Sequence, residues 1–131
     1  MMVAVDTNLV VRYITRDDLA QERKARSVFL QNRIFLPRTV LMETEWVLRF
    51  TYRYRPDQIA DALTRLIENQ GVEVEDDEGT RLALAAFKQG LDFADALHLV
   101  ACGHVETFMT FDKPLQKSAA RLFAKPTVSA P

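Results

Sequence analysis

The chain has 131 residues, enough for one domain that buries roughly two thirds of its unfolded surface. Hydrophobic residues make up 48% of the chain and charged residues 27%, with only 5 Pro and 4 Gly, a profile typical of a compact, helix-rich globular protein. The formal net charge of -1 excludes attraction of the whole molecule to nucleic acid, so any such contact requires a local basic patch.

We expect a single domain over residues 1–131, with an ordered core over about 2–124 and a C-terminal tail at 125–131. The one cysteine, Cys102, cannot form an intramolecular disulfide, and the apolar start at 1–5 is too short for a secretory signal. A cytoplasmic protein is therefore expected. No window reaches the roughly 18 apolar residues of a membrane span, so the sequence predicts no membrane contact.

Strands and helices alternate in the N-terminal half. The apolar run at 2–5 precedes polar residues, which is typical of a strand buried on both faces of a parallel sheet. Thr39 is the expected N-cap of a helix, and Pro56 fits the first turn of the next helix. The expected elements are a strand at 2–5, helices at 10–14 and 19–31, a strand at 34–36, and helices at 39–52 and 56–70.

The same alternation continues in the C-terminal half. Asp92 is suited to cap a helix, which would place Asp95 in its first turn. The expected elements are a strand at 72–75, helices at 77–89 and 93–101, a strand at 107–110 and a helix at 114–123. Because no hairpin signal separates the strands, we predict an α/β fold, a three-layer α/β/α sandwich with a central, mostly parallel sheet of four or five strands.

Four carboxylates occupy unusual settings: Asp6 ends the first apolar run, Glu43 shares a helix face with apolar residues, Asp95 opens a helix, and Asp112 follows a late strand. Asp and Glu are rarely buried unless they are paired or bound to a cation. Ligands of parallel sheets bind outside the carboxyl ends of the strands, where Asp6 and Asp112 are expected. Taken singly, Asp6, Asp95 and Asp112 also fit ordinary helix-start chemistry.

If the four carboxylates converge, the site needs a cation. One close pair of unit charges costs on the order of 4 kcal/mol at an effective dielectric constant near 20, against a total stability of about 5 to 15 kcal/mol. Oxygen ligands without a His or Cys cluster favour Mg²⁺ or Mn²⁺ over zinc. Such an ion would activate water for attack on a phosphodiester, and the spacing leaves open whether one ion binds or two.

Four segments resemble the motifs of PIN domains and, more narrowly, of the VapC-type toxin ribonucleases of VapBC toxin-antitoxin systems. They follow the family's order and usual separations, and the resemblance spans residues 3 to about 118. The segments are VAVDTN at 3–8, VLMETEWVL at 40–48, DFADALH at 92–98 and TFD at 110–112.

The resemblance implies a metal-dependent endoribonuclease that cleaves RNA with Mg²⁺ or Mn²⁺, acting as the toxin of a VapBC pair. It also implies a homodimer and a cognate VapB-type antitoxin that occludes the acidic cleft. Two other functions stay open: a PIN-fold regulatory partner of an antitoxin with little nuclease activity, and a housekeeping RNA-processing nuclease. By resemblance the metal-binding acids are Asp6, Glu43, Asp95 and Asp112, with Asn8 and Thr110 as accessory polar residues that hydrogen-bond the acids or the water.

Two extra acids stand beside these positions. On a helix Glu45 is rotated about 200° from Glu43, so both cannot face one metal, and we choose Glu43 because its expected face is the apolar one. Asp92 is a secondary candidate for the metal site.

Two basic segments are candidates for contacts with RNA or protein. Lys113, Lys117, Arg121 and Lys125 recur every four residues, so a continuous final helix would align them as a solvated face or as a stripe that contacts the RNA backbone. The segment 49–55 interleaves Arg with aromatic residues, which suits base stacking or a protein interface, and the resemblance to VapC-type toxins favours the interface.

Overall fold

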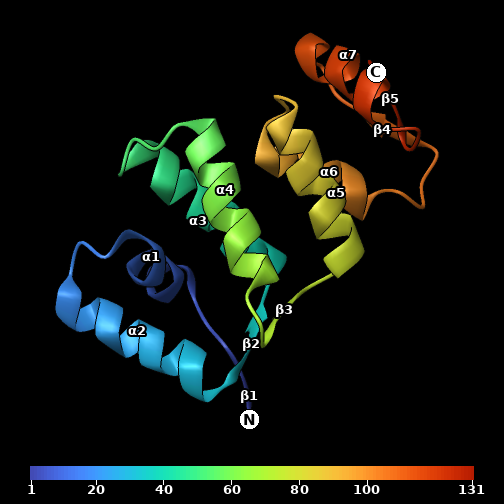
Figure 1. The fold of residues 1–131 in the computed structure, drawn as a ribbon. Helices are drawn as coiled ribbons and strands as arrows, with labels where there is room; N and C mark the ends of the chain where they lie inside the picture. Colours follow the sequence, from blue (N-terminus) through green and yellow to red (C-terminus); the bar gives the residue numbers. More distant parts are fainter. The chain divides into compact units, whose positions relative to one another are not determined.

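The computed structural model describes residues 1–131 and contains seven α-helices and five β-strands (Figure 1). Two compact units divide the chain, an N-terminal unit at Met1–Asp77 and a C-terminal unit at Glu78–Pro131. In chain order the elements are β1 (Met2–Ala4), α1 (Thr7–Thr15), α2 (Leu19–Gln31), β2 (Arg33–Leu36), α3 (Arg38–Phe50), α4 (Pro56–Glu68), β3 (Val72–Val74), α5 (Asp77–Lys88), α6 (Phe93–Ala101), β4 (Thr107–Met109), α7 (Lys113–Leu122) and β5 (Thr127–Ser129).

A three-stranded parallel sheet in the order β1-β2-β3 forms the base of the N-terminal unit. Val3 pairs with Ile34, and Ile34 pairs with Val72. The expectation that the first strand is buried on both faces is wrong: Met2 and Ala4 are exposed and only Val5, just beyond the strand, is buried. β1 lies at the edge of the sheet, so it has a neighbouring strand on one side only.

Two helix starts in the N-terminal unit, those of α1 and α2, are capped by carboxylates. The Leu9 N–H donates to Asp6 Oδ1 at 3.0 Å at the start of α1, and the Gln21 N–H donates to Asp18 Oδ1 at 3.1 Å at the start of α2. Asp6 is therefore a helix cap, as its ordinary interpretation predicts.

The start of α3 differs from the prediction. Thr39 is not the N-cap, because the helix already begins at Arg38 and Pro37 precedes it without a side-chain cap. Instead the Arg38 N–H donates to Glu75 Oε1 at 2.9 Å. Glu75 follows β3, the strand next to β2, so the sheet supplies from a distant residue the acceptor that a local cap would otherwise provide.

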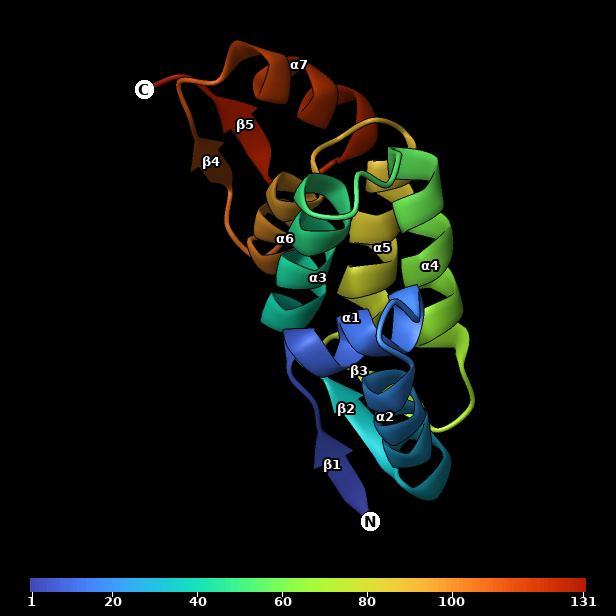
Figure 2. The same cartoon turned by 90° about the vertical axis from the view of Figure 1, so that its left-hand side faces the viewer.

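The C-terminal unit contains α5, α6 and a two-stranded parallel sheet of β4 and β5. Phe87 and Phe93 pack their rings 5.5 Å apart between centroids, and α7 lies beside β5 (Figure 2). β5 was not predicted, because it falls in the segment 125–131 that was assigned to a tail. Its Thr127 pairs with Thr107 of β4.

The α/β class and the parallel strands confirm the predicted fold class. The five strands are divided between a sheet of three and a sheet of two, with one sheet in each unit. The assignment of residues 1–131 to a single domain stays a prediction. None of the seven helices combines the length and the apolar stretch that crossing a bilayer requires.

Candidate active site

The edge of the sheet beyond β1 and β2 brings two candidate residues of the N-terminal unit together. β1 and β2 are parallel neighbours, so the segments that leave their carboxyl ends start at the same edge. Asp6 leaves β1 and α3 leaves β2. Across this edge Thr7 Oγ1 donates to Glu43 Oε1 at 2.9 Å, which holds the Glu43 carboxylate beside the first turn of α1.

Asp6 is exposed and uses one carboxylate oxygen, Oδ1, to cap α1. Oδ2 makes no hydrogen bond within the protein, so the cap orients the carboxylate while leaving one oxygen available to a ligand. Asn8 is exposed and lines a cleft with Asp6. The hydrogen bond to a neighbouring acid comes from Thr7, which the sequence analysis did not single out. The signal available in the sequence was a hydroxyl directly after Asp6, at the start of a helix.

The expected orientation of α3 is wrong. Its buried side consists of Val40, Leu41, Thr44, Glu45 and Leu48, whereas Glu43 is exposed and Trp46 is 39% exposed. Glu45 is the buried acid and pairs with Arg49 through contacts of 2.8 and 3.0 Å.

The reason for choosing Glu43 over Glu45 therefore does not hold. A different observation favours Glu43: the hydrogen bond from Thr7 places it next to Asp6 in the chain's fold. An exposed carboxylate is also accessible to a metal ion and substrate, whereas Glu45 is 1% exposed and already neutralised by Arg49.

Three candidate acids interact in the C-terminal unit. Burial raises the pKa of Asp95, and the negative charges of Asp92 and Asp112 raise it further, while His98 acts in the opposite direction. Asp92 caps α6 by accepting from the Asp95 N–H at 3.0 Å, as predicted. The anionic form of Asp95 is thus disfavoured by its surroundings, and a nearby cation would favour it.

Asp112 and Thr110 form a local turn between β4 and α7. The Leu115 N–H donates to Asp112 Oδ1 at 3.0 Å, which caps α7, and the Asp112 N–H donates to Thr110 Oγ1 at 3.1 Å. Gln116 Nε2 donates to the Thr110 carbonyl at 2.9 Å. Thr110 therefore contacts the backbone of Asp112, whereas the cap bond from Leu115 holds its carboxylate.

The basic stripe is shorter than expected. Lys113, Lys117 and Arg121 lie on α7 and are exposed, but the helix ends at Leu122, so Lys125 is not part of it. His98 is exposed, and Cys102 is a free, partly exposed thiol.

In the segment 49–55, Tyr52 makes polar contacts within the protein, whereas Phe50 is exposed. Tyr52 accepts a hydrogen bond from Arg12 Nη1 at 3.1 Å and donates to Asp17 Oδ2 at 2.7 Å. Phe50 is 65% exposed, with the Arg49 guanidinium 4.5 Å from its ring centroid.

The carboxylates present fit a hard divalent cation in donor type. Asp6 and Glu43 offer oxygen donors in the N-terminal unit, and Asp92, Asp95 and Asp112 offer them in the C-terminal unit. Neither unit by itself arranges three or more His, Cys, Asp or Glu side chains to hold a metal ion. The acids of the C-terminal unit nevertheless repel one another, because charges interact over longer distances than metal–ligand bonds. A cavity of about 540 Å³ lies along α1 and α4 and includes none of the candidate acids.

The fold and these side chains define an α/β protein with exposed carboxylates where its strands end. The family model of the PIN domain matches residues 3–121. The chain therefore belongs to the PIN domain family, whose members are generally nucleases and typically use divalent metals. Comparisons with the curated proteins and with the solved structures gave no match.

Two replacements of Asp112 distinguish its hydrogen bond as a helix cap from its negative charge. We expect Asp112→Asn to keep the free energy of unfolding within about 0.5 kcal/mol, because the amide oxygen also accepts from the Leu115 N–H. Asp112→Ala should lower it by about 1 kcal/mol, because the helix start then lacks an acceptor. Urea unfolding followed by circular dichroism measures both values, and equal stabilities of the two variants would contradict the cap.

Proposed function

We propose that the chain is a metal-dependent endoribonuclease whose acids for binding Mg²⁺ or Mn²⁺ are Asp6, Glu43, Asp95 and Asp112, with Asp92 as a secondary acid. The observation that carries the proposal is the hydrogen bond from Thr7 that holds the exposed Glu43 carboxylate beside Asp6, at the edge beyond β1 and β2. The raised pKa of Asp95, caused by burial and by the charges of Asp92 and Asp112, supports it. Carboxylates that repel one another are expected where a cation normally balances them. PIN family membership and the four motifs support the same function.

A bound divalent ion would supply Lewis-acid stabilisation of the phosphoryl group and a more acidic water. The chain's own residues hold the donors in position. The cap bonds from Leu9 and Leu115 orient Asp6 and Asp112, and each leaves its second oxygen without a hydrogen bond within the protein. Thr7 orients Glu43, and Thr110 contacts the backbone of Asp112. Asn8 is exposed beside Asp6 and would bind the water or the substrate.

The proposal extends to a toxin of the VapBC type, with RNA as substrate and a VapB-type antitoxin as partner. It is supported by the resemblance of all four motifs, from residue 3 to about 118. Trp46 and Phe50 on α3 are 39% and 65% exposed and would contribute to a homodimer interface, because aromatic residues are enriched in such surfaces.

Cleavage should depend on the carboxylate charges. Asp6→Asn and Asp112→Asn are expected to abolish cleavage of single-stranded RNA with Mg²⁺ or Mn²⁺, since an amide keeps the cap but lacks the anionic donor. Product formation on a denaturing gel measures this, and EDTA should stop the unmodified protein. Asp18→Asn is the matched control, because Asp18 caps α2 through the same kind of bond. Undiminished cleavage by either active-site variant would contradict the proposed function.

The toxin assignment makes a separate prediction. Expression of the unmodified chain in bacteria should arrest growth, and Asp6→Asn should restore it, because arrest by a toxin of this type requires RNA cleavage. Colony counts under induction measure the effect, with Asp18→Asn again as the control. RNA cleavage in vitro together with normal growth would favour a housekeeping nuclease instead. Growth arrest that persists in Asp6→Asn would favour a binding function.

Thr7 should act as a positioning residue for Glu43. Thr7→Val removes the hydroxyl that donates to Glu43 Oε1 and is expected to lower kcat about 10-fold, the lower end of effects seen when a group that orients a ligand is removed. Thr7→Ser keeps the donor and should restore most of the activity. A titration of Mn²⁺ binding provides a second readout, in which Thr7→Val alone should weaken affinity. Equal kcat and Mn²⁺ affinity in both variants would contradict this role.

A further inference from the structure

A cleft of about 290 Å³ lies between α1 and α2 and opens beside Asp6. Its volume is close to the lower limit of ordinary ligand pockets. Polar and charged side chains make up most of its lining, and two of them, Arg12 and Lys24, are cations. The lining residues are Asp6, Asn8, Leu9, Arg12, Gln21, Lys24, Ala25 and Val28.

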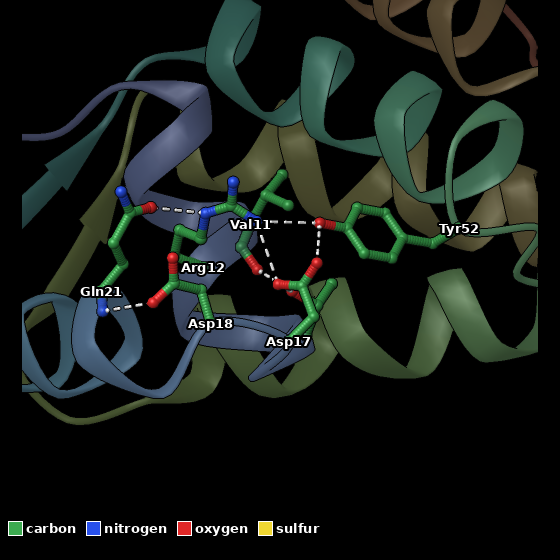
Figure 3. A network of polar contacts seen from close by, with 7 residues as sticks. Val11, Arg12, Asp17, Asp18, Gln21 and Tyr52 are labelled. Carbon is green, nitrogen blue, oxygen red and sulfur yellow. Dashed lines mark hydrogen bonds and ion pairs between the residues drawn. The ribbon is translucent and has the colours of Figure 1, made fainter.

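Arg12 is held in one position by three side chains. Its Nε donates to Gln21 at 2.6 Å, and its Nη1 donates to Asp17 at 3.0 Å and to Tyr52 at 3.1 Å. Figure 3 shows these contacts converging on one guanidinium. Nη2 makes no hydrogen bond within the protein. Its N–H groups can therefore donate to a ligand, while Nε and Nη1 hold the guanidinium in place.

The anionic partner of Arg12 is itself held in place. The hydrogen bond from Tyr52 lowers the pKa of Asp17, and the hydrogen bond from Thr15 and the charge of Arg12 lower it further, against a smaller opposing effect of burial. Asp17 does not line the cleft, whereas Arg12 does. The network therefore fixes the guanidinium of a residue that lines the cleft, while the compensating carboxylate is not part of the lining.

Lys24 supplies a second cation on the opposite helix. It is exposed on α2, lines the cleft and makes no ion pair. A positioned Arg and an unpaired Lys at one small cleft suit a phosphate group, because Arg presents a planar fork of donors and Lys a compact charge. An Arg that is already ordered also loses little side-chain entropy on binding.

We propose that this cleft binds a backbone phosphate of single-stranded RNA next to the phosphate that is cleaved, with Arg12 and Lys24 as its cationic contacts. The proposal rests on the proposed nuclease function, because Asp6 is both a wall of the cleft and a member of the proposed metal site. An acidic protein segment would meet the same cations, but the shared Asp6 favours the substrate. Contacts to phosphate position a nucleic acid without reading its sequence, so the cleft would set the register of the strand.

Binding of RNA in EDTA tests the cleft without requiring cleavage, because its contacts come from cations of the chain. The probe is a short, fluorescein-labelled, single-stranded RNA of mixed sequence, and fluorescence anisotropy measures Kd at several salt concentrations. Lys24→Gln should raise Kd severalfold and reduce the slope of log Kd against log salt by about 0.7, the value for one phosphate contact on a single strand. Arg12→Gln should act in the same direction.

Arg23→Gln is the matched control, because Arg23 is exposed on the same helix and does not line the cleft. Arg12→Gln disturbs the network with Asp17 and Tyr52. If Arg12→Gln does not fold, the comparison of Lys24→Gln with Arg23→Gln is sufficient to test the proposal. The same Kd and salt slope in Lys24→Gln and Arg23→Gln would overturn the proposal and leave the cleft to an acidic protein segment. Absence of measurable RNA binding by the unmodified chain would also overturn it.

The two proposals fail in different ways. Loss of RNA binding in Lys24→Gln with undiminished cleavage by Asp6→Asn would support phosphate binding in the cleft and contradict the proposed metal site. Unchanged RNA binding in Lys24→Gln with loss of cleavage in Asp6→Asn would contradict phosphate binding in the cleft and support the proposed nuclease function.

Discussion

The parallel pairing of β1 with β2 is the constraint on which the N-terminal part of the candidate site depends. Parallel neighbours end at the same edge of a sheet, so the helices that follow them, α1 and α3, start side by side even though about 30 residues separate them. Thr7 in the first turn of α1 can then donate to Glu43 at 2.9 Å. An antiparallel pairing would send the two helices to opposite edges, and Asp6 and Glu43 would not meet.

Helix capping and ligand binding are compatible in one carboxylate, and the candidate acids show why. Asp6 and Asp112 each accept a backbone N–H with Oδ1, which fixes the side chain without any ligand. The positive end of the helix dipole lowers the cost of the negative charge. The second oxygen then has a defined direction and no partner within the protein. The two interpretations that compete for such an acid in a sequence are therefore complementary in the fold.

The sequence predicted the elements well wherever local signals decide them, as at Pro56 in the first turn of α4 and Asp92 at the N-cap of α6. It failed where the partner is distant. Glu75, not Thr39, caps α3 because β3 lies next to β2, and the Thr7 bond to Glu43 spans 36 positions. The buried side of α3 was misassigned because Glu45, a charged residue, lies on it with Arg49 as its partner, while Trp46 and Phe50 face outward. β5 was missed because its segment was assigned to a C-terminal tail, and its partner β4 lies about 20 positions earlier in the chain.

The charge of the whole chain is a poor guide to nucleic-acid binding in a protein of this kind. A net charge of -1 averages over acids that would attract a metal and bases that would contact phosphate, and the two groups need to be close for the chemistry to work. Asp17 illustrates the point: it cancels the charge of Arg12 in any sum, yet it fixes the guanidinium without itself lining the cleft beside Asp6. A compensating acid of this kind removes net charge and uses Nη1, but Nη2 makes no hydrogen bond within the protein and can still donate to a ligand. The direction in which a cation's donors point therefore decides its use for phosphate, and that direction is set by partners such as Tyr52 that contribute nothing to the net charge.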